Sequence, residues 1–240
     1  LYPLCQGKAK ALLLGAGKLM VQWVMDALAR AKHVGRVAVV GLDGGLSFPR
    51  EIRYLPNQGE FLDNVQIGVR TLLESEPQTP CFLLISSDIP AVTGSHIDWV
   101  IEQALATQDE FYYCVLERKA MEGLFPGCRR TFFRFRDREV CGGDVAVIGT
   151  SLFSKDTGVW QKLTEVRKSR WKTAATIGLD VLLLFLLGLL SIDEAVRKAS
   201  RRLGVQGRAL FCPYPEVGMD VDKPFQLDIV NEYLLRRGSG

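Results

Sequence analysis

The sequence predicts an α/β protein with three layers, in which helices cover both faces of a mostly parallel central sheet. The first observation is the run from Phe82 to Ile85, four consecutive apolar residues typical of a strand buried on both faces. The second is the alternation of such runs with segments of helical spacing along the chain. Because a helix between two strands allows a right-handed crossover, this alternation favours parallel strands.

The predicted elements follow one another as helix and strand. Strands are expected over 34–42, 52–55, 82–85, 111–116, 144–148 and 207–212. Helices are expected over 20–31, 61–73, 95–105 and 225–235. One more helix is expected to begin after the capping signature Ser191–Glu194 and to end near Gly204.

We expect one domain over residues 1–240 with two additions. Residues 117–148 are predicted to form a β-rich insertion, because 131–136 alternate with period two and a strand follows Gly142 and Gly143. Residues 159–204 are predicted to form a helical extension that is first basic and then, over 177–190, strongly apolar. This apolar run is too short for a membrane span and is interrupted by Asp180, so we expect a buried helix or a homodimer contact.

Composition excludes several classes of protein. An apolar content of 48% and a charged content of 24% are ordinary for a soluble domain. A net charge of +3 without a basic stripe does not favour nucleic acid as a partner. The six cysteines show no C-x-x-C pairing, and neither of the two histidines has a metal-ligand neighbour. With no secretion signal at the first residues, we expect free thiols and a cytoplasmic protein.

Two acidic loops follow buried strands. Asp88 comes directly after the central strand, in the stretch Ser87-Asp88-Ile89-Pro90, and Asp220 and Asp222 precede Pro224 near the end of the chain. Ligands of open α/β sheets bind beyond the carboxyl ends of the strands, and Mg²⁺ prefers carboxylate, phosphate and water oxygens. The two loops could therefore hold one Mg²⁺ against a triphosphate. The alternative is that Asp88 only turns or caps the chain.

These residues resemble the MobA-like nucleotidyltransferases, which have the GT-A-type nucleotide-diphospho-sugar transferase fold, a Rossmann-like arrangement. The resemblance runs nearly end to end, and the motifs that carry it are Lys10 with 12–18, the helix 20–31, Gln58-Gly59 with Asn64, Ser87-Asp88-Ile89-Pro90, and Asp220-Val221-Asp222-Lys223-Pro224 with Leu227. The family begins with a strand and a Gly-rich phosphate loop, and residues 2–8 correspond only to the tail of that loop.

The resemblance implies transfer of a nucleoside monophosphate from an NTP to a small phosphorylated metabolite or sugar phosphate, with release of pyrophosphate. Asp88 and Asp222 would be the Mg²⁺ ligands, and Lys10 would contact the triphosphate. Gln58, Gly59 and Asn64 would lie near the base and the ribose. Candidate acceptor-binding residues are Asp144, Arg167 and Lys168, against the alternatives of a turn residue and a solvated basic face.

Two other functions stay open at this point. A GT-A glycosyltransferase would use a nucleotide sugar, but that chemistry typically has an Asp-x-Asp after the central strand, where this chain has Asp88-Ile89-Pro90. A non-catalytic nucleotide-binding module would bind without turnover. The sequence identifies neither the NTP nor the acceptor, and it does not decide between Asp220 and Asp222 as metal ligand.

Overall fold

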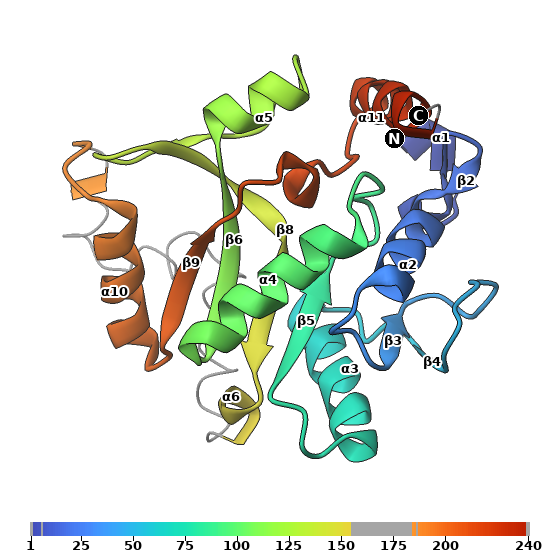
Figure 1. Cartoon of the computed structure of the whole chain (residues 1–240), viewed down its shortest axis with the longest axis horizontal. Helices are drawn as coiled ribbons and strands as arrows, with labels where there is room; N and C mark the ends of the chain where they lie inside the picture. The colour runs from blue at the N-terminus through green and yellow to red at the C-terminus, as the bar shows by residue number, and fades with distance from the viewer. Residues whose placement is uncertain (1, 6, 155–183, 186, 239–240) are drawn as a thin grey trace.

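A central five-stranded sheet organises the chain, in the order β5-β8-β6-β9 with β7 paired beside β8 (Figure 1). The computed structural model describes residues 2–5, 7–154, 184–185 and 187–238. The strands of this sheet are β5 (Cys81–Ile85), β6 (Phe111–Glu117), β7 (Phe133–Arg134), β8 (Glu139–Gly149) and β9 (Gly207–Phe211).

Three of the four main strands run in the same direction. β8 pairs antiparallel with both β5 and β6, whereas β6 and β9 pair in parallel, so β5, β6 and β9 are parallel to one another. The sheet is therefore mixed but mostly parallel. Residues 139–148, the last part of the predicted β-rich insertion, belong to β8, which lies inside the sheet between β5 and β6.

A second, smaller pair of strands lies beside the β5 edge (Figure 1). β3 (Val37–Val40) and β4 (Ile52–Leu55) are parallel to each other, and within the described residues they form a sheet of their own. A cavity of about 490 Å³ separates β3 from β5, lined by residues 33–38 and 79–85 among others. The core is nevertheless continuous, since Val37 of β3 belongs to the main apolar cluster.

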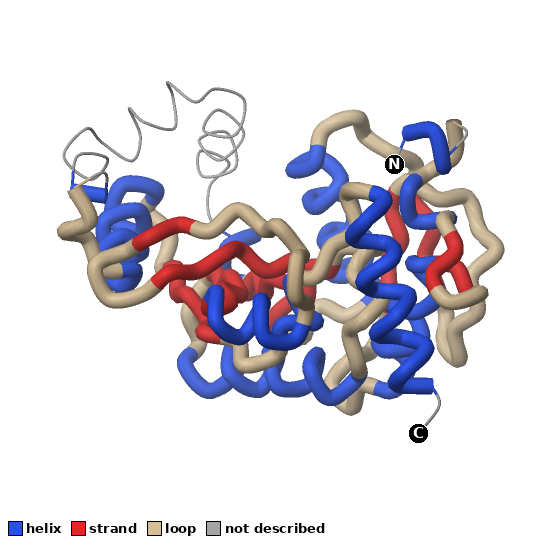
Figure 2. Tube along the Cα trace, turned by 90° about the horizontal axis from the view of Figure 1, so that it is seen from above, coloured by secondary structure: helices blue, strands red, loops and turns tan. Residues whose placement is uncertain are grey.

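Helices cover both faces of the sheet, which confirms the predicted three-layer α/β/α class. On one face Cys114, Leu116 and Val147 share a core with α2 (Met20–Arg30), α4 (Gly94–Thr107) and α11 (Pro224–Gly238). On the other face Phe82 and Ile148 pack with α3 (Phe61–Ser75), while α10 (Ile192–Leu203) contacts β9. Seen from above, helices lie on both sides of the strands (Figure 2). Alternate residues of each strand supply the two cores, as the pleat requires.

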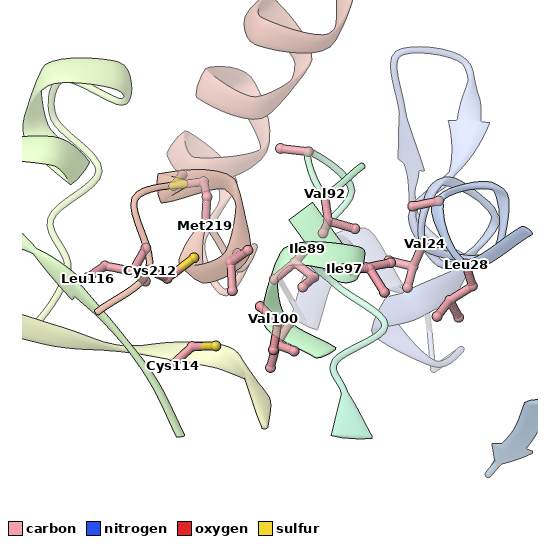
Figure 3. Packing of buried hydrophobic residues seen from close by; sticks show 14 of the residues in the cluster. Val24, Leu28, Ile89, Val92, Ile97, Val100, Cys114, Leu116, Cys212 and Met219 are labelled. Atoms are coloured by element: carbon pink, nitrogen blue, oxygen red, sulfur yellow. The ribbon is translucent and has the colours of Figure 1, made fainter. Parts of the chain in front are cut away.

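Small apolar side chains pack α2 against α4 on the same face of the sheet. Val24 and Leu28 of α2 meet Ile97 and Val100 of α4, and the strand residue Cys114 lies beside Cys212 (Figure 3). Gly94, at the start of α4, allows this approach, because a Cβ there would lie 2.9 Å from the backbone carbon of Arg30.

The predicted helices and main strands are confirmed, with ends that differ by a few residues. Ser191 caps α10 as expected: its backbone N–H donates to the Glu194 carboxylate at 2.9 Å, and its hydroxyl accepts the Glu194 N–H at 3.3 Å. The remaining described elements are α1 (Tyr2–Cys5), η1 (Lys10–Leu12), β1 (Leu14–Gly15), β2 (Lys18–Leu19), α5 (Arg118–Leu124), α6 (Ser151–Ser154) and η2 (Pro215–Gly218).

Part of the predicted extension lies outside the described residues. This part contains Arg167, Lys168 and most of the apolar run 177–190, so the homodimer contact through that run stays a prediction. Among the helices that are described, none is both long and apolar enough to cross a bilayer.

Candidate functional site

Three carboxylates from two distant loops meet at one edge of the sheet. Asp88 follows β5, and Asp220 and Asp222 lie between η2 and α11. One oxygen of each carboxylate lies within 4.8 Å of the others. The loops are also joined through the backbone, where the Val221 N–H donates to the Asp88 carbonyl at 3.1 Å. Since β5 and β9 are parallel, this is the edge where their carboxyl ends lie together, as the sequence predicts.

The second acidic loop is held by apolar residues that alternate with the acids. Met219 and Val221 are 0% exposed, so their side chains anchor the loop in the core. Gly218 lets the loop pass close to the sheet, because a Cβ there would overlap the Leu116 side chain and lie 3.3 Å from Cα of Gly143. The position of Asp220 and Asp222 therefore depends on a close backbone crossing.

Lys10 lies between the two predicted metal ligands. Its ammonium donates to Oδ1 of Asp222 at 2.5 Å and forms an ion pair with Oδ2 of Asp88. Burial lowers the pKa of Lys10, but the hydrogen bonds and charges of Asp222 and Asp88 outweigh burial, and the pKa is raised overall. The ammonium is thus a firmly charged cation at the centre of the acidic cluster.

Arg130 and Asp144 extend the cluster on the other side of Asp220. Arg130 donates to the Gly142 carbonyl at 2.9 Å and to Oδ2 of Asp144 at 3.3 Å, and it forms an ion pair with Asp220. Its side chain is only 15% exposed. Burial raises the pKa of Asp144 to about 6; Arg130 opposes this, and the negative charges of Asp88 and Asp222 add to it. The pKa of Asp144 therefore depends on the charges of the acidic cluster.

The donor set fits a hard divalent cation. Oδ1 of Asp220 is buried and lies against the Arg130 guanidinium, which offsets its charge. Asp220 also offers a carboxylate oxygen close to those of Asp88 and Asp222, and a hard divalent cation prefers such a set of oxygen ligands. This geometry adds Asp220 to the candidate ligands that the sequence left undecided.

Gln226 is a site residue that sequence reasoning missed. Its Oε1 accepts the backbone N–H groups of Asp222 and Lys223, both at 2.9 Å, and its Nε2 donates to the Cys128 carbonyl at 3.2 Å. It thus connects the acidic loop to the loop that carries Arg130. A local signal existed, because a glutamine at the third position of a helix that begins at Pro224 can accept the backbone N–H that precedes the helix, as the third residue of a capping box does.

Two of the predicted nucleotide-binding residues, Gln58 and Gly59, lie in the turn between β4 and α3, and the third, Asn64, lies in the first turn of α3. Oδ1 of Asn64 accepts the Gln58 N–H at 2.7 Å, and the Gly59 N–H donates to Oδ1 of Asn57 at 2.9 Å. Gly59 has a φ of +89°, a conformation that favours glycine. Within the described part of the chain, these residues make no hydrogen bond or ion pair to the acidic cluster, and their role stays a prediction.

The glycine-containing motif after Lys10 forms a tight hairpin. Ala16 and Gly17 have φ values of 48° and 82°, as a two-residue turn between β1 and β2 requires. The Ala16 N–H donates to Oδ1 of Asn231 at 2.8 Å, which ties the hairpin to α11. Lys18 pairs with Asp26 at 2.6 Å, away from the cluster. The motif thus has a structural role beside the helix α11 that follows the second acidic loop.

Comparison with known proteins gives one family. The model of the MobA-like NTP transferase domain matches residues 6–154, more than half of the chain. No curated relative matches at a significant level. A hypothetical transferase from Thermus thermophilus is 34% identical, with a TM-score of 0.81 over 93% of this chain and 92% of the other.

Two more distant structures share the fold. A CMP:2-keto-3-deoxy-manno-octonic acid synthetase complexed with CTP is 13% identical, with a TM-score of 0.54 over 95% of this chain and 92% of the other. A 4-diphosphocytidyl-2C-methyl-D-erythritol synthase from Anaerococcus prevotii is 12% identical, with a TM-score of 0.55 over 93% of this chain and 88% of the other.

Proposed function

The chain belongs to the family of MobA-like NTP transferase domains, and from this we propose that it transfers a nucleoside monophosphate from an NTP to a small phosphorylated metabolite or sugar phosphate. Pyrophosphate is the second product. The observation that carries the proposal is the convergence of Asp88, Asp220 and Asp222 around Lys10 at the carboxyl ends of parallel strands. This arrangement suits a substrate with several phosphates and a divalent cation.

The carboxylates of Asp88 and Asp222 would hold Mg²⁺, with Asp220 as a third candidate. A bound Mg²⁺ would supply positive charge against the NTP phosphates. Lys10 adds a second positive charge to the same place, where the pyrophosphate leaving group develops negative charge. We assign Lys10, Asp88 and Asp222 to the catalytic machinery on this basis.

The rest of the chain positions the two substrates. The proposal places the base and ribose near the turn with Gln58, Gly59 and Asn64, and the acceptor near Asp144, with Arg167 and Lys168 as further acceptor contacts. Transfer needs the acceptor oxygen in line with the α-phosphorus, and holding both reactants in place supplies much of the rate enhancement. The mechanism requires no nucleophile from the chain.

The test is pyrophosphate release from each of the four NTPs, with Mg²⁺ and a panel of phosphorylated acceptors. CTP is the first choice, since the synthetase of similar fold is complexed with CTP. We expect Asp88→Asn to lower the rate by about 100-fold or more, because it removes a carboxylate ligand of the Mg²⁺ that would neutralise the charge developing on the phosphates. Asp228→Asn, an exposed carboxylate on α11, is the matched control and should leave the rate unchanged.

Two results would contradict the proposal. Full activity of Asp88→Asn would remove the role assigned to this carboxylate. Turnover of a nucleotide sugar without pyrophosphate release would instead identify a glycosyltransferase.

A further inference from the structure

A cavity of about 460 Å³ opens beside the acidic cluster, and Asp222 and Arg130 form part of its wall. Its lining differs between two sides. One side carries the cations Arg129, Arg130 and Lys223, whereas the other carries aromatic and aliphatic residues of β6, β7, β8 and α10. A pocket with a charged part and an apolar part favours ligands that carry a charged group at one end and an apolar group at the other.

The cations of the polar side are not all used by the protein. Arg130 is paired with Asp144 and Asp220. Arg129 and Lys223 are exposed and make no ion pair within the described part of the chain, although the Arg129 guanidinium lies over the Phe225 ring at 5.3 Å from its centroid. Gln226 fixes the backbone at both cations. Its side chain accepts the Lys223 N–H, and it donates to the carbonyl of Cys128, the residue before Arg129. Two cations beside Asp222, without an acidic partner among the described residues, favour the binding of an anion.

The apolar side exposes rings that a soluble protein normally buries. The Phe133 side chain on β7 is 49% exposed and that of Tyr113 on β6 is 42% exposed, and both line this cavity. Phe133 and Phe135 pack on Phe185, with ring centroids 6.3 Å and 5.2 Å apart, so the wall is an assembled aromatic surface. Rings on two strands that face one cavity provide area for an apolar group.

We propose that this cavity binds the acceptor, and that the acceptor joins an anionic group, such as a phosphate, to an apolar or aromatic body. The proposal rests on the proposed function for its place in catalysis, and it narrows the acceptor class. The phosphate lies at Arg129 and Lys223, close to Asp222, and the body lies against Phe133 and Phe135.

The group transfer is balanced in this arrangement. An acceptor phosphate oxygen, having given any proton it carries to solvent, forms a bond to the α-phosphorus of the NTP. The bond between the α-phosphorus and the oxygen bridging to the β-phosphate breaks, and pyrophosphate leaves with that electron pair.

Binding of two phosphate monoesters to the full chain tests the proposal without turnover. Phenyl phosphate and glycerol 3-phosphate carry the same anionic group on an aromatic and a hydroxylated body, and isothermal titration calorimetry measures both. We expect phenyl phosphate to bind at least about tenfold more tightly. Phe133→Ser should remove this preference, and Lys223→Gln should weaken both ligands alike. Phe61 on α3 is about as exposed as Phe133, and Phe61→Ser should change the affinity for neither ester.

Each outcome decides the proposal. Equal affinities, no binding of either ester, or a preference that persists in Phe133→Ser would overturn it. Failure of the proposed function gives a different pattern, in which phenyl phosphate binds preferentially but no NTP yields pyrophosphate. Pyrophosphate formed with sugar phosphates only would keep the proposed function and overturn this inference.

Discussion

At the scale of single residues, Asp144 reports the electrostatics of the site. Its carboxyl lies beside Arg130 and senses the charges of Asp88 and Asp222. Burial is the main reason that its pKa rises from the ordinary 3.8 to about 6. The folded chain therefore binds this proton more tightly than the unfolded chain does.

The sign of the pH dependence follows from this difference. The contribution of Asp144 to stability is fully present below pH 3.8 and is lost as the pH rises through about 6, a change of about 3 kcal/mol. We expect the metal-free wild type to lose stability relative to Asp144→Asn over this range. Urea unfolding at several pH values, with Asp228→Asn as control, measures the difference; parallel pH profiles for wild type and Asp144→Asn would contradict it.

The sequence allowed some site residues to be predicted and not others. Asp88 stands directly after a buried strand, and Asp222 lies in the loop that follows the last strand, where the fold class alone places side chains at a ligand-binding edge. Arg130 was not among the predicted site residues, because nothing local reveals its partners Asp144 and Asp220, which lie elsewhere in the chain. Gln58, Gly59 and Asn64 were predicted as a group; Asn64, in the first turn of α3, accepts the Gln58 N–H, and their role at the nucleotide stays a prediction.

At the scale of elements, the start of α11 connects the two loops that carry the charged residues. Gln226 is 4% exposed and satisfies three backbone groups, two in the acidic loop and one at Cys128. Apolar replacement would leave these buried groups without partners. The start of α11 therefore fixes both loops of the site through hydrogen bonds.

Gln226→Met keeps the length of the side chain and removes its polar atoms. We expect the free energy of unfolding to fall by about 1–3 kcal/mol. We also expect weaker phenyl phosphate binding, since the loop with Arg129 loses its link to Lys223. Urea unfolding and calorimetry measure the two effects. Gln103→Met, at an exposed position of α4, serves as control. If Gln226→Met had the same stability and the same phenyl phosphate affinity as this control, the role of Gln226 in holding the two loops would be contradicted.

Strand β8 shows why the order of the sheet could not be read from the sequence. Its residues were predicted partly as an insertion, because period-two alternation marks a strand without identifying its neighbours. Its pairing with both β5 and β6 brings together segments that are far apart in the chain. The helices were predicted more closely, since apolar spacing and caps such as Ser191 are local signals.

At the scale of the whole molecule, the two sheets should differ in local stability. β8 is hydrogen-bonded along both edges, whereas β3, among the strands that the structure describes, pairs with β4 alone and faces the cavity beside β5. Fewer ladder bonds and a neighbouring cavity lower the free energy of local opening. We expect amide hydrogen exchange to be slowest in β6 and β8 and clearly faster in β3. Equal protection of β3 and β8 would show that both sheets open as one unit.

The central claim is that two distant loops form one divalent-cation site. Electron paramagnetic resonance of Mn²⁺, titrated into the full chain with CTP, tests it most directly. We expect one Mn²⁺ bound per chain, with affinity reduced at least about tenfold in both Asp88→Asn and Asp222→Asn and unchanged in Asp228→Asn. Mn²⁺ binding that survives either of the first two substitutions at full affinity would contradict the claim.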